Sequence, residues 1–212
     1  MGSRCREMTE GPRGQLPPPL SQPLPRTIEG PRVTLRSHEV DAASALGDLV
    51  MSNLDHLSIL PFAEREPLTL DERRAMIEEW ELTRLAGRDC IYGIWCGDQL
   101  IGSCGLHRRL PDPAALEIGY WIDAAHEGQG FVRESVLLLT ETAFTFEEID
   151  VVVICFDVQN DRSRAVATSC GFETVRTVEM AQEFRTAASS GREDVTEMRR
   201  AAFDVAWRDA TS

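Results

Sequence analysis

The stretch Glu117–Leu139, EIGYWIDAAHEGQGFVRESVLLL, decides the fold. A strand-like segment leads into a short loop with Gly128 and Gly130, and a helix is expected from about Gly130. The apolar positions of that helix recur every three or four residues: Val132, Val136, Leu139 and Ala143. The start of a helix offers unpaired backbone N–H groups and the positive end of the helix dipole, and glycine lets an anion approach the backbone. The stretch therefore predicts a phosphate site, although two glycines before a helix are by themselves more typical of a plain turn.

Toward the N-terminus, the patterns predict a strand, two helices and three consecutive strands. The two helices are expected over Asp41–Leu60 and Glu72–Leu85, the second capped by Thr69 or Asp71. The strands are expected at Arg32–Ser37, Cys90–Cys96, Gln99–His107 and Leu116–Ile122, with Gly97-Asp98 as the turn of a hairpin. Because the middle strands follow one another without helices between them, a doubly wound sheet is excluded.

Toward the C-terminus, Asp150–Asp157 is almost continuously apolar, as expected for a strand covered on both faces. A short helix at Asn160–Cys170 and strands at Phe172–Glu179 and Asp194–Phe203 follow. The order predicts an α/β fold with a mixed, mostly antiparallel central sheet flanked by helices. We expect one domain over residues 31–205, a disordered Pro/Arg-rich tail over residues 1–30 and a short C-terminal tail over residues 206–212.

Composition limits the function classes. The 212 residues carry a net charge of −13, which argues against nucleic-acid binding, because phosphate contacts need a basic face. No apolar run approaches the ~18 residues that span a bilayer, and no secretory signal is evident, so we expect a cytoplasmic protein without a membrane partner. An acidic surface attracts cationic partners such as amines or basic peptides. The sequence also leaves a homodimer open.

Cysteine and histidine spacing predicts no metal site. The six cysteines include no CxxC pair, and the four histidines form no HxH or HExxH pattern. Zinc needs four converging ligands, which usually come in close sequence pairs.

Three motifs resemble those of GNAT acetyltransferases. Glu127–Val132 is similar to their pyrophosphate-binding motif, Gln/Arg-x-x-Gly-x-Gly/Ala, and the preceding EIGYWID resembles the branch that acetylates the N-termini of ribosomal proteins. Asn160-Asp161-Arg162-Ser163 followed by Cys170-Gly171-Phe172 resembles the Asn-x-x-Ser and Gly-Phe motifs of that branch. The resemblance implies a GNAT-like acyl-CoA N-acyltransferase fold with acetyl-CoA as co-substrate. The residues that it implies for coenzyme binding are Trp121, Ile122, Glu127, Gly128, Gln129, Gly130, Phe131, Val132, Asn160 and Ser163.

Two positions depart from the pyrophosphate motif. Glu127 stands where Gln or Arg is usual, and Val132 replaces a small residue. A carboxylate at position 127 repels phosphate unless it points away, and Arg133 can offset its charge.

The implied reaction is the attack of a neutral amine on a thioester, which needs a base, an oxyanion donor and a path for the leaving thiolate. We expect Glu117 as the base, with His107 or a water chain as alternatives. The resemblance implies that Ser163 hydrogen-bonds the coenzyme sulfur, because Ala167 stands where many relatives have a tyrosine. The backbone amide near Ile122 is the expected oxyanion donor.

The acceptor stays open at this level. It is either a protein N-terminal α-amine or a small-molecule amine, such as an antibiotic or a toxin, and the acyl group is acetyl or a longer one. A catalytically weak coenzyme A-binding regulatory module and an interaction protein built around the N-terminal tail are the alternatives to an enzyme.

Overall fold

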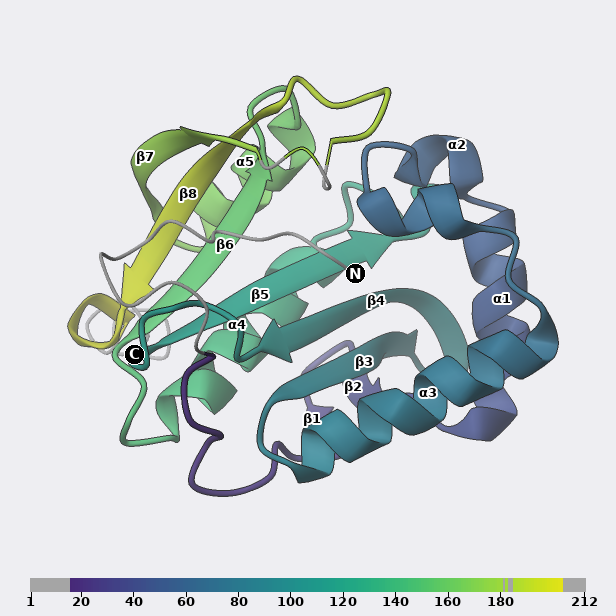
Figure 1. Cartoon of the computed structure of the whole chain (residues 1–212), viewed down its shortest axis with the longest axis horizontal. Coiled ribbons are helices and arrows are strands. Elements are labelled where there is room, and N and C mark those ends of the chain that lie inside the picture. Colours follow the sequence, from purple (N-terminus) through teal and green to yellow (C-terminus); the bar gives the residue numbers. More distant parts are fainter. Residues whose placement is uncertain (1–15, 181, 183–184, 204–212) are drawn as a thin grey trace.

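The computed structural model describes residues 16–180, 182 and 185–203. The molecule is built around one eight-stranded sheet in the order β1-β2-β3-β4-β5-β6-β8-β7 (Figure 1). The strands are β1 (Thr27–Glu29), β2 (Thr34–Ser37), β3 (Asp89–Cys96), β4 (Gln99–His107), β5 (Ala115–Ile122), β6 (Val151–Asp157), β7 (Glu173–Glu179) and β8 (Arg192–Arg199). The α-helices are α1 (Ala43–Met51), α2 (Leu54–Leu57), α3 (Leu70–Leu85), α4 (Phe131–Phe144) and α5 (Asp161–Ser169), and the 3₁₀ turns are η1 (Val40–Ala42), η2 (Pro61–Arg65) and η3 (Ala124–His126).

The sheet is mixed and mostly antiparallel, which confirms the predicted fold class. β5 and β6 are its one parallel pair among the described strands, and all other neighbours run antiparallel. The predicted hairpin between β3 and β4 is confirmed, with Gly97 at a φ of 58° in the turn. This positive φ is the conformation that glycine adopts without a Cβ penalty.

The predicted single helix over residues 41–60 is wrong. α1 ends at Met51, and α2 begins only at Leu54. Asn53 breaks the helix because its amide is used elsewhere: Nδ2 donates to Leu49 O (2.9 Å), and Oδ1 accepts the N–H of Ala124 (2.9 Å). This second bond ties the break to the segment after β5, and it positions α2 beside the start of α4.

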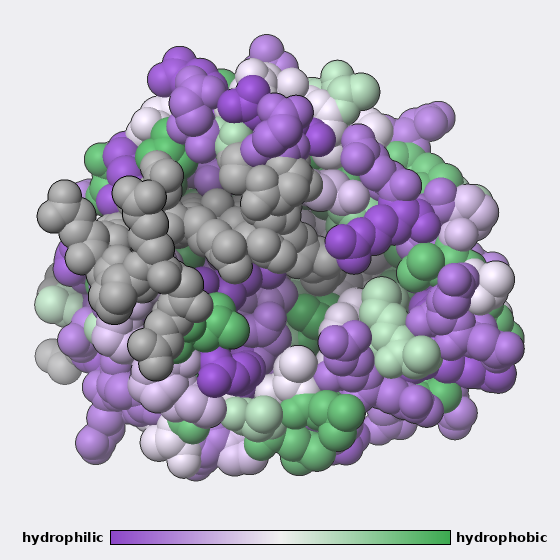
Figure 2. All heavy atoms as spheres, viewed as in Figure 1, coloured by the Kyte–Doolittle hydropathy of each residue, from purple (hydrophilic) through white to green (hydrophobic). Residues whose placement is uncertain are grey.

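The two faces of the sheet carry different helices. α4 packs Val136 and Leu139 against the face that carries Ile118, whereas α1 and α3 cover the face that carries Trp121. Figure 1 looks onto the second face, with α3 in front and α4 behind the sheet. Hydrophobic side chains on the surface in this view form scattered patches among hydrophilic ones, as expected for an acidic chain (Figure 2).

β5 and β6 separate part-way along their length. Their ladder runs only from Ala115 and Val151 to Ile118 and Ile154, although β5 continues to Ile122 and β6 to Asp157. The two arrows diverge accordingly in Figure 1. This leaves the facing edges of β5 and β6 unpaired at their C-terminal ends, while their other edges still pair with β4 and β8. Such an opening is where open sheets of this class bind ligands.

Part of the predicted disordered tail belongs to the domain. Leu24 is fully buried in the main core, and β1 pairs with β2 at the sheet edge. The tail prediction is therefore wrong for residues 16–30, whereas residues 1–15 and the predicted C-terminal tail lie outside the described residues.

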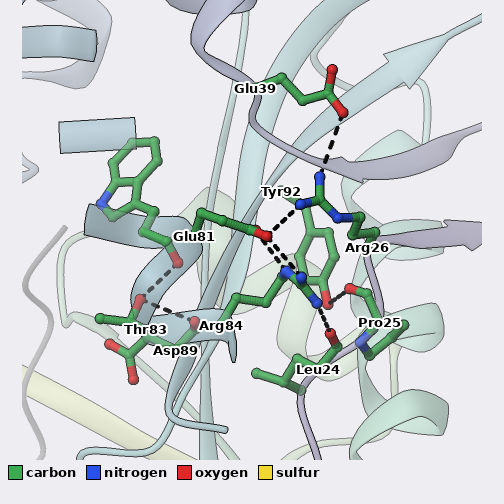
Figure 3. A network of polar contacts seen from close by, with 10 residues as sticks. Leu24, Pro25, Arg26, Glu39, Glu81, Thr83, Arg84, Asp89 and Tyr92 are labelled. Carbon is green, nitrogen blue, oxygen red and sulfur yellow. Dashed lines mark hydrogen bonds and ion pairs between the residues drawn. The ribbon is translucent and has the colours of Figure 1, made fainter. Parts of the chain in front are cut away.

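Side-chain donors explain how a proline-rich segment can dock without regular structure. Arg84 Nη1 donates to the carbonyl of Leu24 (2.6 Å), and the Tyr92 hydroxyl donates to that of Pro25 (2.9 Å). Arg26 pairs with Glu81 and with Glu39 (Figure 3). The extended backbone thus obtains its hydrogen bonds from side chains of α3 and β3, so that no helical or strand periodicity is needed.

Candidate active site

A cleft opens where β5 leaves β6, beside the start of α4. Gly128 and Gly130 adopt φ angles of 69° and 80°, and Gly130 is the N-cap of α4 without a side chain that caps the helix. A helix start without a side-chain cap leaves its first amides free to meet an anion. The cleft beside this loop has a volume of about 670 Å³, which suits an elongated ligand.

Nine of the ten residues that the sequence predicted for coenzyme binding line this cleft. They are Trp121, Ile122, Glu127, Gly128, Gly130, Phe131, Val132, Asn160 and Ser163. Gln129 does not line it: its side-chain amide donates to Ala125 O (3.1 Å), and its carbonyl accepts from Arg32 Nη1 (2.9 Å). Gln129 therefore braces the loop.

Sequence reasoning missed other polar side chains of the cleft, among them His56, Tyr120 and Arg162, whereas Arg133, expected to offset the charge of Glu127, does line it. Arg162 lies within the Asn-x-x-Ser motif, at a position that the motif leaves open. His56 comes from α2, about 70 residues before the loop, and only the tertiary fold brings it to the cleft.

The carboxylate of Glu127 is paired with Arg162 and lies beside His56. Its Oε1 accepts a hydrogen bond from Arg162 Nη1 (2.8 Å) and lies 3.3 Å from His56 Nε2. The three residues link α2 to α5 across the cleft. The repulsion expected between Glu127 and a phosphate is therefore countered by an adjacent guanidinium.

The start of α5 brings Asn160 and Ser163 to the gap between the strands. Asn160 Oδ1 accepts the Ser163 N–H (3.1 Å) and so caps the helix. Tyr120 donates its hydroxyl proton to the Ser163 carbonyl (3.2 Å). Within the described residues, no hydrogen bond is made by the Ser163 hydroxyl itself, so it is available to a ligand in the cleft.

The amide of Ile122 also faces the gap. Asp123 donates its N–H to Ile101 O (2.8 Å), so the amide of Asp123 points toward β4. Amide directions alternate along an antiparallel strand, so the Ile122 N–H points to the other edge. β6 has already left the ladder there, because the last parallel pair is Ile118 with Ile154.

A second cavity, of about 90 Å³, lies on the sheet face opposite α4. Its polar lining includes His107, Arg109, Asp157 and Glu193, and it shares Tyr120, Trp121, Asn160 and Ser163 with the cleft. The two cavities therefore meet around the separated ends of β5 and β6.

Comparison with known families decides what kind of protein carries this cleft. The family model described as the acetyltransferase (GNAT) domain matches residues 32–173. The chain belongs to the GNAT acetyltransferase family. It is thus an acyl-CoA-dependent N-acetyltransferase, and the resemblance derived from the three motifs is confirmed.

Named relatives of this GNAT protein point to the ribosomal-protein branch. The chain is 30% identical over 141 residues to the putative ribosomal N-acetyltransferase YdaF of Bacillus subtilis, which covers 66% of this chain and 77% of the relative. It is 34% identical over 82 residues to the ribosomal-protein-serine acetyltransferase of Escherichia coli, which covers 39% of this chain and 46% of the relative.

Solved structures share the fold of this GNAT protein. The RimL ribosomal L7/L12 alpha-N-protein acetyltransferase, in complex with coenzyme A, superposes with a TM-score of 0.74 at 23% identity and covers 85% of this chain and 99% of that one. The microcin C7 self-immunity acetyltransferase MccE, in complex with acetyl-CoA and AMP, has a TM-score of 0.70 at 19% identity. The match covers 80% of this chain and 93% of MccE.

The structure places Glu117, the base expected from the sequence, where it is poorly suited to that role. The GNAT chain buries this side chain completely, and Glu117 is not among the residues that line either cavity. Its two oxygens accept hydrogen bonds from Arg109 Nε (3.0 Å) and Nη2 (3.2 Å). Both oxygens of Glu117 are thus occupied by the guanidinium and face neither cavity, so we assign Glu117 to the positioning of Arg109.

His107, the alternative base, does line the smaller cavity of the GNAT domain. Its Nδ1 lies 3.1 Å from Asp89 Oδ2. Burial, followed by the positive charge of Arg109, lowers the pKa of His107. The imidazole is therefore neutral near pH 7, with one nitrogen engaged by Asp89.

None of the helices in the described part of the GNAT chain is long and apolar enough to cross a membrane. The same residues contain no cluster of three or more His, Cys, Asp or Glu side chains that could hold a metal ion.

Proposed function

We propose that the protein transfers the acetyl group of acetyl-CoA to the N-terminal α-amine of a protein, by direct attack within a ternary complex. The observation that carries the proposal is the meeting of two cavities at the gap between β5 and β6, one on each face of the sheet. A thioester placed in the gap from the α4 side is open to an amine that arrives from the other side. The names of the B. subtilis and E. coli relatives favour a ribosomal protein as the acceptor.

The larger cleft is assigned to the coenzyme. The amides of the Gly128–Gly130 loop and of the first turn of α4 would hold the pyrophosphate, with Arg133 and Arg162 as the neighbouring cations. Asn160 would bond the pantetheine, and the unbonded hydroxyl of Ser163 would bond the thioester sulfur.

The Ile122 amide is assigned to the oxyanion. It points into the gap, where the carbonyl carbon of the thioester would lie, and a fixed amide donor costs no reorganisation when negative charge develops. Because a thiolate is a good leaving group, the amine can attack directly and no covalent enzyme intermediate is needed. Ser163 would then stabilise the departing thiolate.

A thiol-release assay tests this function. Acetyl-CoA and succinyl-CoA are each incubated with peptides that begin with the N-terminal sequences of ribosomal proteins, with polyamines and with aminoglycosides. We expect release with acetyl-CoA and at least one peptide, together with a mass increase of one acetyl group at the peptide's N-terminus. Thiol release with the small amines alone would show that the acceptor is a small-molecule amine. Thermal stabilisation by acetyl-CoA without release from any amine would favour a coenzyme-binding regulatory module.

A further inference from the structure

Glu193 lies in the smaller cavity and its carboxylate has no partner among the described residues. It is the second residue of β8 and pairs with Asp157, the last residue of β6, at the end where β6 has left β5. Only 3% of Glu193 is exposed, yet its carboxylate lines the cavity and makes no hydrogen bond or ion pair with the described residues. A buried carboxylate is normally paired, because an unpaired one is strongly disfavoured.

The neighbouring charges leave Glu193 in a negative environment. Glu117 is held by Arg109, and Asp157 accepts hydrogen bonds from the N–H (2.7 Å) and the hydroxyl (3.0 Å) of Ser190. Burial, followed by the charges of Glu117 and Asp157, raises the pKa of Glu193 to about 7. The two other carboxylates therefore have partners, whereas Glu193 has room for a cation that the described residues do not supply.

His107 supplies a second acceptor to the same cavity. Burial raises the pKa of Asp89, but the hydrogen bond with His107, the backbone N–H of Arg108 and the charge of Arg109 together lower it more, to about 2. Asp89 is thus a carboxylate, so Nδ1 of His107 must donate to it and Nε2 carries a lone pair. That Nε2 is buried and has no hydrogen-bond partner among the described residues. Gly105 and Gly119 leave space beside it, since a Cβ would lie 3.0 and 3.5 Å from Nε2.

An anion and a neutral acceptor in one small cavity form a site for a primary ammonium group, which carries three N–H donors. We propose that Glu193 is the general base of the reaction and that His107 Nε2 orients the amine. This role rests on the proposed function. It implies that the acceptor amine binds in its protonated, ammonium form.

The proton balance of the step is simple. The ammonium gives one proton to the Glu193 carboxylate, and the neutral nitrogen forms a bond to the thioester carbonyl carbon. The carbon–sulfur bond breaks, and the thiolate takes a second proton from the acylated nitrogen, with the Ser163 hydroxyl beside the sulfur. Glu193 then releases its proton to solvent. The products are an amide, free coenzyme A and one proton.

The test compares Glu193→Gln with Glu197→Gln. Glu197 lies on the same strand and pairs with the surface residue Arg199 (2.9 Å), outside both cavities. With a peptide acceptor, we expect Glu193→Gln to lower kcat/KM by roughly 10²–10⁴ at pH 7, where most of an α-amine with its ordinary pKa of about 7.7–8.0 is protonated. The deficit should narrow at pH 9, where the amine is already neutral. Glu197→Gln should retain wild-type kcat/KM at both pH values.

Two further measurements separate the outcomes. Stabilisation by acetyl-CoA should be the same in both variants and the wild type, because Glu193 lies outside the larger cleft. Glu193→Asp, which keeps a carboxylate, should recover part of the lost activity. Full activity of Glu193→Gln, or an equal deficit at pH 7 and pH 9, overturns the base assignment alone. If the wild type acetylates no amine at any pH, the proposed function fails and the base assignment fails with it.

Discussion

A buried carboxyl group whose neighbours are carboxylates prefers to be neutral, and this preference links Glu193 to the stability of the whole protein. Its pKa in the fold is raised to about 7, above its ordinary value of 4.5. Because the folded protein favours the neutral carboxyl group, Glu193 makes a contribution to stability that is fully present below pH 4.5. That contribution is lost as the pH rises through 7.

We therefore predict that Glu193→Gln, which mimics the neutral acid, melts at the same temperature as the wild type near pH 4.5 and at a higher temperature at pH 8.5. A difference on the order of 2 kcal/mol, after allowance for solvent screening, corresponds to roughly 4–8 °C for a domain of this size. Differential scanning calorimetry at the two pH values measures it. A constant offset between the two proteins across this range would show that Glu193 titrates normally. Because the measurement needs no substrate, it is independent of the acetyltransferase assay.

At the residue scale, the residues proposed for coenzyme binding were easier to find in the sequence than the residue proposed as the base. Nine of the predicted residues line the larger cleft, and they come from three short motifs whose local backbone shapes it. The proposed base belongs to no such motif. Glu117 is engaged by Arg109, eight residues earlier, through a loop that folds back on β5, and Glu193 comes from a strand that carries no motif. Only the packed sheet shows which carboxylate remains unpaired within the part of the chain that the structure describes.

At the scale of single elements, the start of α4 carries the coenzyme assignment. Gly130 has a φ of 80°, and a Cβ there would lie 3.3 Å from the guanidinium of Arg32. Gly130→Val should therefore distort the loop and abolish the thermal shift caused by millimolar acetyl-CoA, which linkage puts at about 2.7 kcal/mol at 100 times Kd. Far-ultraviolet circular dichroism should stay close to that of the wild type.

Gly97→Val is the matched control for this variant. Gly97 also has a positive φ, of 58°, but it lies in the β3–β4 turn and a Cβ there meets nothing within 4 Å. Both substitutions force valine into an unfavourable backbone conformation and should cost stability. Only Gly130→Val should lose the response to acetyl-CoA. If Gly130→Val is still stabilised by acetyl-CoA, this loop does not bind the pyrophosphate.

Most elements were predictable because their periodicity is local. The hairpin of β3 and β4, the helix after Gly130 and the apolar strand β6 follow directly from spacing and turn residues. The break between α1 and α2 was not predictable, because it depends on a hydrogen bond from Ala124 to Asn53, 71 residues away. The separation of β5 from β6 was likewise hidden, because no pattern within a strand reports where its neighbour departs.

At the scale of the whole molecule, the N-terminal segment closes one end of the core. Composition suggested disorder because prolines interrupt every regular pattern in residues 16–30. The segment instead contributes Leu20 and Leu24 to the main core and β1 to the sheet edge. Among the donors to its carbonyls are Arg84 and Tyr92 (Figure 3). Their role as donors is visible only after α3 and β3 are assembled.

This contact predicts that the segment is needed for stability. Leu24 is 0% exposed, so Leu24→Ala should lower the free energy of unfolding by about 2–5 kcal/mol, with a fall in Tm of roughly 2–4 °C per kcal/mol. Leu16, which is 53% exposed in the same segment, supplies the control: Leu16→Ala should change stability by no more than about 0.5 kcal/mol. Urea denaturation of both variants gives the values. Because Leu24 lies in neither cavity, Leu24→Ala should still be stabilised by acetyl-CoA at temperatures where it is folded. Equal stability of the two variants would mean that residues 16–30 leave the domain in solution, and the core would then end at β2.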